Sequence, residues 1–121
     1  MRELPTGNTY RIGEKEFHFS LAESILELMT GLKGVDVARL APYDGMLFDF
    51  GTTDFMIMTP RGCVMALDLA FIDADGVIKE ITTLDPTLGF NRATSGNVRY
   101  ALEVPIGFFD THNIQVGDIL V

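Results

Sequence analysis

Asp68 is the residue whose surroundings in the sequence are most suggestive of chemistry. It lies in the run 63–72, in which alternate residues share a face if the run is a β-strand. The other residues on its face are small or apolar: Val64, Ala66, Ala70 and Ile72. A carboxylate in this setting lies either on the floor of a shallow basin, where it can hold a polar ligand, or on a solvated face. If it is buried without a ligand, it needs hydrogen-bond donors such as backbone amides or an arginine.

The sequence offers neighbours for this carboxylate. Thr59 and Arg61 precede the run, and Arg99 belongs to a later alternating segment. We predict that Thr59, Asp68 and Arg99 bind a small polar ligand beneath a loop over residues 84–97. A loop of that length in a compact domain is more often functional than idle. Purely structural pairing of Asp68 remains the alternative.

A hydrolase is a further alternative, and it needs several groups to converge in one cleft with shifted pKa values. The candidates are Asp68, Asp73, Glu103, Asp118 and the histidines. Alternation over 98–104 predicts Glu103 and Arg99 on the solvent side of their strand and Val98, Tyr100, Leu102 and Val104 inside. The sequence alone does not bring these groups together.

Metal and cofactor motifs are weak. The run Asp73-Ala74-Asp75-Gly76 resembles the start of a calcium loop but lacks the later ligands, so a hairpin turn is the interpretation. His18 and His112 form no metal-spaced pair. The single cysteine, Cys63, forbids an internal disulfide and indicates a small buried thiol. We therefore predict no metal site and no cofactor.

The elements that would position these residues are mostly strands. Period-two alternation marks five segments, 46–50, 54–59, 63–72, 77–83 and 98–104, and a hairpin over 9–20 and a last strand at 119–121 complete the set. Segment 54–59 is apolar on both sides and is interpreted as a central strand. The predicted fold is mainly β, a compact β-sandwich or partly open barrel of about seven to eight strands.

One short α-helix is predicted near residues 25–32. Ser24 and Glu27 have the spacing of a capping box. The helix would bury a stripe of residues at positions i, i+3, i+4 and i+7: Ile25, Leu28, Met29 and Leu32.

Length and charge bound the remaining possibilities. The 121 residues predict one domain, with 1–16 as a lead-in and first hairpin arm and 17–121 as a single β domain. Nine basic against seventeen acidic residues give a net charge of −8, which disfavours nucleic acid and anionic membranes as partners. No signal-peptide pattern is visible, so the expected compartment is cytoplasmic unless a leader was removed.

Several short motifs, in order from about Phe17 to the C-terminus, resemble one protein family. They are Ala22-Glu23-Ser24 with Glu27 and Gly31-Leu32, Gly45-Met46-Leu47-Phe48, Phe55-Met56 with Thr59, Leu67-Asp68 with Phe71-Ile72-Asp73 and Gly76, Tyr100 with Leu102-Glu103-Val104, and Gly117-Asp118. The chain resembles the domain of unknown function 192 family.

The resemblance implies a β-sandwich-like fold without an established activity, and many members carry an export signal or membrane anchor. This chain departs from the family pattern at Ile57-Met58, where a Lys-Asn pair is usual. It departs again at Lys33-Gly34 and at Pro86-Thr87, the latter in place of a Pro-Cys pair.

These observations favour a non-catalytic domain that binds a small polar ligand or acts as an accessory domain. The second interpretation is a structural or protein-interaction module that self-associates through an exposed strand edge. The hydrolase is third. The sequence leaves the oligomeric state open.

Overall fold

The computed structural model of the chain describes residues 3–88 and 92–121, without the side chains of residues 54–56 and 92–96. The six strands are β1 (Gly7–Ile12), β2 (Lys15–Ala22), β3 (Gly45–Met58), β4 (Leu67–Ile72), β5 (Ile78–Leu84) and β6 (Arg92–Pro105). The three helices are short: α1 (Ile25–Thr30), α2 (Val37–Leu40) and α3 (Phe108–Thr111).

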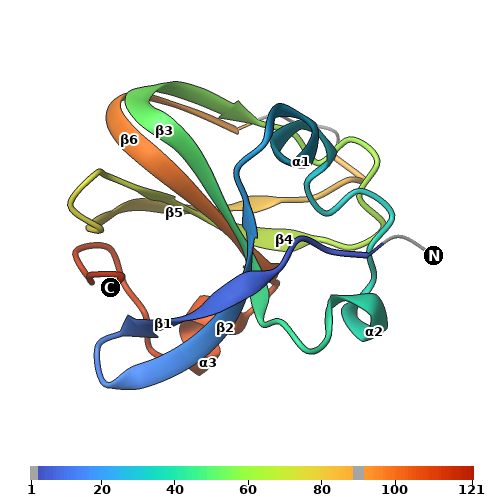
Figure 1. Cartoon of the computed structure of the whole chain (residues 1–121), viewed down its shortest axis with the longest axis horizontal. Helices are drawn as coiled ribbons and strands as arrows, with labels where there is room; N and C mark the ends of the chain where they lie inside the picture. The colour runs from blue at the N-terminus through green and yellow to red at the C-terminus, as the bar shows by residue number, and fades with distance from the viewer. Residues whose placement is uncertain (1–2, 89–91) are drawn as a thin grey trace.

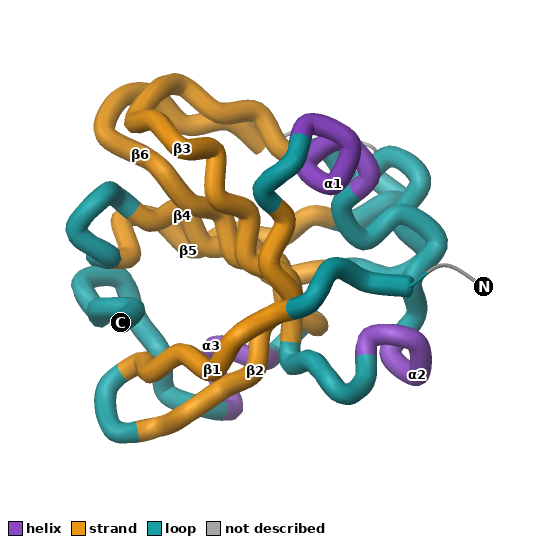
Figure 2. The backbone as a smooth tube through the Cα atoms, in the orientation of Figure 1, coloured by secondary structure: helices purple, strands orange, loops and turns teal. Residues whose placement is uncertain are grey.

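The strands form one six-stranded sheet in the order β1-β2-β3-β6-β4-β5. Strand β2 runs parallel to β3, and the other neighbours are antiparallel. The sheet curves strongly, and the C-terminal segment lies between the β1–β2 hairpin and the turn before β5 (Figures 1 and 2). There the Arg11 amide donates to the Val121 carbonyl at 3.0 Å, and the Leu120 amide donates to the Gly76 carbonyl at 2.8 Å. The predicted mainly β fold is confirmed, with a sheet that is curved but not closed.

Apolar residues cover both faces of the sheet. One cluster includes Met46 and Phe48 of β3 and Leu67, Leu69 and Phe71 of β4. The cluster on the opposite face includes Leu47 of β3, Ala70 and Ile72 of β4, Leu102 and Val104 of β6, and both phenylalanines of α3. The three central strands, β3, β6 and β4, therefore have no solvent-facing side over much of their length.

Two local predictions are confirmed. Ser24 caps α1, because its hydroxyl accepts from the Glu27 amide while the Glu27 carboxylate accepts from the Ser24 amide. Asp73 and Gly76 close the hairpin between β4 and β5. The Asp73 carboxylate accepts from the Asp75 and Val77 amides, and Gly76 adopts a positive φ of 87°.

Several predicted boundaries were wrong. Segments 46–50 and 54–59 belong to one strand, β3, whose second half pairs with β6 alone and is not central. The predicted run 63–72 is a strand only from Leu67. The predicted 84–97 loop is shorter, because β6 starts at Arg92 and pairs with the end of β3. Residues 89–91 of that loop lie outside the described residues.

The predicted burial of the α1 stripe was also wrong. Ile25 and Met29 are 79% and 69% exposed, whereas Leu28 is half-buried and Leu32, just after the helix, is buried. Helix α1 is only six residues long, and its C-cap, Gly31, lies beside the Phe48 ring of β3. The helix therefore does not form a layer that covers the core.

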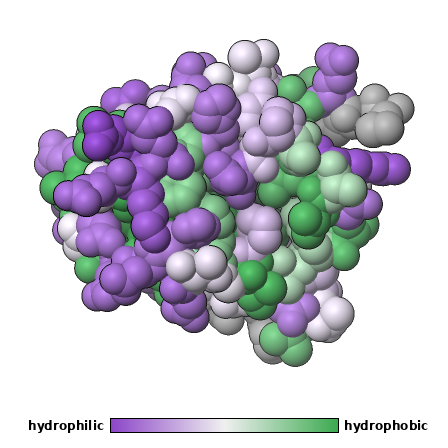
Figure 3. Space-filling view, turned by 90° about the horizontal axis from the view of Figure 1, so that it is seen from below, coloured by the Kyte–Doolittle hydropathy of each residue, from purple (hydrophilic) through white to green (hydrophobic). Residues whose placement is uncertain are grey.

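The surface is largely hydrophilic in the view from below, with hydrophobic residues gathered toward one side (Figure 3). None of the helices in the described part of the chain has the length and apolar character needed to cross a membrane.

The C-terminal bridge makes Gly76 sensitive to substitution. A Cβ at position 76 would overlap the Leu120 carbonyl oxygen, and the positive φ disfavours any side chain. Gly76→Ala should therefore destabilise the fold by more than the 1–3 kcal/mol expected for a left-handed non-glycine residue. Gly13→Ala is the matched control, because Gly13 has a φ of 63° and nothing lies within 4 Å of its would-be Cβ. Equal losses in urea denaturation would contradict this account.

Candidate functional site

The cavity beside Glu103 is the strongest candidate site, and we call it the Glu103 cavity. Its volume is about 280 Å³. It lies between the C-terminal end of α1, strands β3 and β6, and the connection from β3 to β4. Its walls are mainly apolar, with Met29, Phe48, Phe50, Ile57 and Met58 among the lining residues.

Glu103 reaches this cavity from the middle of the sheet. Strand β6 lies between β3 and β4, and Glu103 pairs in register with Met46 on one side and Leu69 on the other. Both neighbours are completely buried, and Glu103 itself is only 3% exposed. Removal from water disfavours the charged carboxylate, and this burial raises the pKa of Glu103 from 4.5 to about 8.

The Glu103 carboxyl group has no hydrogen bond or ion pair with any residue in the described part of the chain. Its Oε1 lies 3.9 Å from the place where a Cβ would stand on Gly31, just after α1. Such a Cβ would also crowd the Phe48 ring at 3.1 Å. The bare Gly31 backbone therefore lets the end of α1 approach the carboxyl group closely.

The polar groups of the wall come from loops around this carboxyl. Thr30 and Lys33 lie at and after the end of α1, and Thr59 and Cys63 follow β3. Burial, and to a smaller extent the charge of a nearby ionised Glu103, raise the pKa of the Cys63 thiol to about 11, against a smaller lowering by Lys33. At neutral pH the cavity thus presents a protonated thiol and a largely protonated carboxylic acid.

The structure does not assemble the predicted ligand set of Thr59, Asp68 and Arg99. Thr59 lines the Glu103 cavity. Asp68 points to the opposite face of the sheet, where its carboxylate accepts from the Gly107 amide at 2.8 Å and from the Thr83 hydroxyl at 3.1 Å. These two bonds match the structural alternative for Asp68.

Arg99 lies elsewhere again. Its guanidinium donates twice to the Asp49 carboxylate, at 3.1 and 3.3 Å, and lies 5.0 Å from the centre of the Tyr100 ring. The bonds to Asp49 raise the pKa of Arg99. The three predicted residues therefore line no common cavity among those described, and their joint binding of a ligand stays a prediction.

The predicted orientation of Glu103 was wrong. Alternation along 98–104 placed it on a solvent face together with Arg99, but β6 is a central strand and both of its faces are covered near Glu103. The available signal was the apolar company of Glu103 in the run Ala101-Leu102-Glu103-Val104, which is typical of a strand buried on both sides. Ile57, Met58 and Lys33, three departures from the family pattern, line the same cavity.

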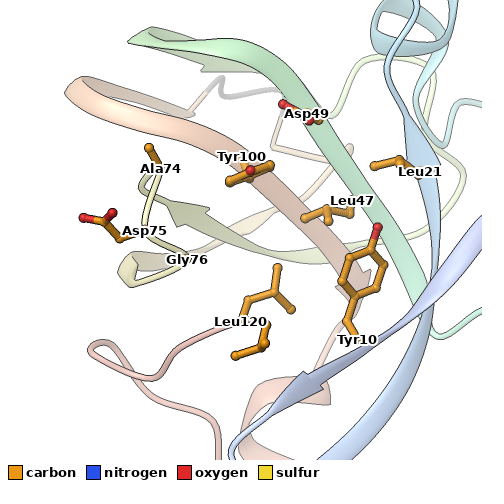
Figure 4. Close-up of a pocket in the computed structure, with 10 residues that line it drawn as sticks. Tyr10, Leu21, Leu47, Asp49, Ala74, Asp75, Gly76, Tyr100 and Leu120 are labelled. Carbon is orange, nitrogen blue, oxygen red and sulfur yellow. The ribbon is translucent and has the colours of Figure 1, made fainter.

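A second cavity of about 270 Å³ lies on the other side of the fold, between β1, β3, β6 and the C-terminal segment. In Figure 4, Tyr10, Leu47, Tyr100 and Leu120 surround it, with Asp49 at its upper edge. The Asp49 carboxylate is already bonded to Arg99. This cavity therefore offers apolar contacts, but its Asp49 carboxylate, unlike that of Glu103, already has a hydrogen-bond partner.

The other carboxylates named for a hydrolase do not gather around Glu103. Asp68 lies on the opposite face, Asp73 holds the β4–β5 turn, and Asp118 accepts from the Gln115 amide in a C-terminal turn. Among residues 3–88 and 92–121, no group of three or more His, Cys, Asp or Glu side chains could hold a metal ion.

The raised pKa of Glu103 makes stability depend on pH. Between pH 4.5 and about 8 the folded chain keeps a proton on Glu103 that the unfolded chain has released. This contribution is fully present below the unfolded pKa and is lost as pH rises toward 8, by up to about 1.4 kcal/mol per pH unit. Glu103→Gln should flatten the decline in the free energy of unfolding, measured by urea denaturation from pH 5 to 8.

The control for this measurement is Glu80→Gln, because Glu80 is exposed on the edge strand β5. Its profile should follow that of the unmodified protein. Parallel pH profiles for Glu103→Gln and the unmodified protein would show that the Glu103 carboxyl is not held protonated by the fold.

Cys63 should react slowly in the folded protein. A thiol pKa of about 11, raised from 9.0, lowers the thiolate fraction at pH 8 by roughly 100-fold, and thiolate is the nucleophile. Alkylation by iodoacetamide should be slower by at least that factor in the folded chain than in urea, as followed by mass spectrometry. Equal rates in the two states would show that the fold does not raise the pKa of the Cys63 thiol.

Comparison with solved structures supports the fold along the whole chain. A protein from Sinorhizobium meliloti described as a "putative transcription regulator" superposes with a TM-score of 0.88 at 26% sequence identity, over 100% of this chain and 97% of that one. A protein of unknown function from Novosphingobium aromaticivorans gives a TM-score of 0.81 at 22% identity, over 95% of this chain and 84% of that one. No curated protein matches the sequence.

A family model settles the relationship that the motifs suggested. The model of the DUF192 family, described as an uncharacterized ACR, matches residues 8–121. This match covers nearly the whole sheet, both cavities and all three helices. The chain therefore belongs to the DUF192 family, a family of unknown function.

Proposed function

We propose that this chain is a non-catalytic small-ligand-binding domain and that the Glu103 cavity is its site. The observation that carries the proposal is the carboxyl group of Glu103, a residue only 3% exposed that lines a cavity of about 280 Å³ and has no hydrogen bond to a described residue. No fully buried side-chain oxygen or nitrogen of the described residues lacks a partner, so the carboxyl oxygens keep their small exposure. Buried polar groups in proteins are nearly always hydrogen-bonded, because desolvation without a partner is costly. A ligand with a complementary polar group would supply the missing partner.

The shape and lining of the cavity support a small ligand. Ligand pockets are mostly apolar with a few convergent polar groups, and they range from about 300 to 1,000 Å³. The Glu103 cavity, at about 280 Å³, lies just below this range, which suits a small ligand. Its polar groups include Thr30, Thr59 and Glu103, which come from three different segments that border one apolar space.

The chemistry of the lining supports binding rather than turnover. General acid–base catalysis and nucleophilic catalysis each need a reactive group next to a second group that activates or orients it. The Cys63 thiol is held protonated by its environment. No histidine or second carboxylate lines this cavity in the described part of the chain.

Nucleic acid and anionic membranes are not proposed as direct partners. The net charge of −8 opposes the counterion exchange on which DNA binding and much membrane-surface binding depend. If the regulator description of the Sinorhizobium meliloti protein has a counterpart in this chain, it would be as the ligand- or protein-binding part of a regulatory system.

Protein–protein interaction is the second candidate, and the exposed apolar residues beside the cavity favour it. Ile25, Leu26 and Met29 of α1 are 69–79% exposed, and Ile57 at the end of β3 is 58% exposed. Apolar side chains grouped on a surface are typical of contact sites. A molecular mass that rises with concentration would favour self-association over a solitary ligand-binding domain.

A fragment screen by thermal shift and ligand-observed NMR tests the proposed function. The library should contain matched neutral, cationic and anionic compounds. A ligand at about 100 times its Kd should stabilise the fold by about 2.7 kcal/mol. Thr59→Trp should abolish binding, because Thr59 is an exposed lining residue and the indole would fill the mouth of the cavity.

Thr52→Trp is the matched control, since Thr52 is an exposed threonine of β3, the strand that Thr59 follows, and does not line the cavity. Binding that survives Thr59→Trp would move the site elsewhere. A library in which no compound of any charge binds would remove the proposed function.

A further inference from the structure

We infer that the Glu103 cavity selects small organic cations, each with a single ammonium group on a short apolar or aromatic body. This inference rests on the proposed function, and it specifies the class of ligand. Three features of the cavity carry it: an unpartnered carboxyl group, two adjacent aromatic rings and the sign of the surrounding charge.

The carboxyl group is the anchor. Met46 and Leu69 flank Glu103 within the sheet, so neither neighbouring strand supplies a donor or a positive charge from its side chain at this position. A proton neutralises the acid, which agrees with its raised pKa. An ammonium ion in the cavity would neutralise the carboxylate equally and would add charge-assisted hydrogen bonds, which are stronger than neutral ones.

The aromatic rings favour the same ligand. Phe48 and Phe50 lie two residues apart on the same face of β3, and both line the cavity. Their rings are stacked with centroids 6.3 Å apart and planes 14° apart. Ring faces carry partial negative charge and attract cations placed within about 6 Å. The Thr30 and Thr59 hydroxyls of the wall can accept further N–H bonds.

The remaining charges limit the ligand to one positive group. The net charge of −8 raises the local concentration of cations around the protein. Lys33 is the basic residue among the described lining residues, and its methylene stem would lie within 3.1–3.5 Å of a Cβ on Gly62. Glu103 is the one carboxylate among the described lining residues, so the cavity can neutralise one ammonium group and a monoamine fits better than a diamine.

The titratable lining residues that face Glu103 are few. Lys33 approaches from the turn after α1, and Cys63 approaches from the connection between β3 and β4. Strands β3 and β4 place Met46 and Leu69 at its sides, and neither can titrate. A change in protonation on binding near neutral pH is therefore assigned to Glu103 within the described residues.

Binding then exchanges one cation for another. The ammonium ligand enters with its charge unchanged, Glu103 loses its proton, and buffer takes that proton up. At pH 7 nearly one proton should be released per ligand, because Glu103 is mostly protonated below its pKa of about 8. Affinity should rise by nearly tenfold per pH unit between pH 6 and 7.

Benzylamine, benzyl alcohol and benzoate are the matched probes, with the same ring and a positive, neutral or negative head. A cavity of about 150 Å³ accommodates benzene, so the Glu103 cavity has room for the ring and its substituent. Isothermal titration in two buffers of different ionisation enthalpy measures both affinity and proton release. Benzylamine should bind at least tenfold more tightly than benzyl alcohol at pH 7, and benzoate should bind weakest.

Glu103→Gln keeps the shape of the side chain and should remove the preference for benzylamine, its pH dependence and the proton release. The proton count on the unmodified protein tests the inference even if this variant does not fold. The cation assignment would be overturned if benzyl alcohol bound as tightly as benzylamine, or if benzylamine bound without proton release. In that case the proposed function would still stand, provided that Thr59→Trp blocked the binding. If neither the three probes nor any library compound bound, the cation assignment and the proposed function would both be overturned.

Discussion

The burial of the Glu103 carboxyl in a strand covered on both faces is the constraint on which the rest of the site depends. Strand β6 lies between β3 and β4, with one apolar cluster on each face of the sheet. A charged side chain in such a position requires a partner, a proton or an opening. The described part of this chain provides no partner, and it places the carboxyl group against a cavity.

A proton is the smallest partner that a buried carboxyl can take, and it is also the easiest to replace. The free energy that holds it on Glu103 comes from desolvation, the one cause of the raised pKa. A ligand that brings positive charge into the cavity offsets this cost of desolvation by attracting the ionised carboxylate. The negative charge of an ionised Glu103 raises the pKa of the Cys63 thiol, so the two groups on the wall are linked electrostatically.

Local signals in the sequence were enough to predict the mainly β fold. Alternation correctly separated the two faces of β4, and the Ser24 capping box and the Asp75-Gly76 turn formed as predicted. What alternation could not supply was the order of strands. Pairing between β6 and the distant β3 and β4 decides whether the second face of β6 meets water or another layer, and this pairing is non-local. The exposure of Ile25 and Met29 follows from the same limit, since periodicity identifies an apolar side of a helix but not what covers it.

The two acids on which the site predictions turned show why a site is harder to predict than a strand. The Asp68 carboxylate accepts hydrogen bonds from the Gly107 amide and the Thr83 hydroxyl, which are 39 and 15 positions away in the sequence. Glu103 receives no such donor from the described residues, although its neighbours in the sequence are equally apolar. The role of a carboxyl group on a strand is therefore set by the donors that distant segments bring to it. The acid that stood out in the sequence is satisfied by the fold, and the acid assigned to solvent is the one that the fold leaves available for a ligand.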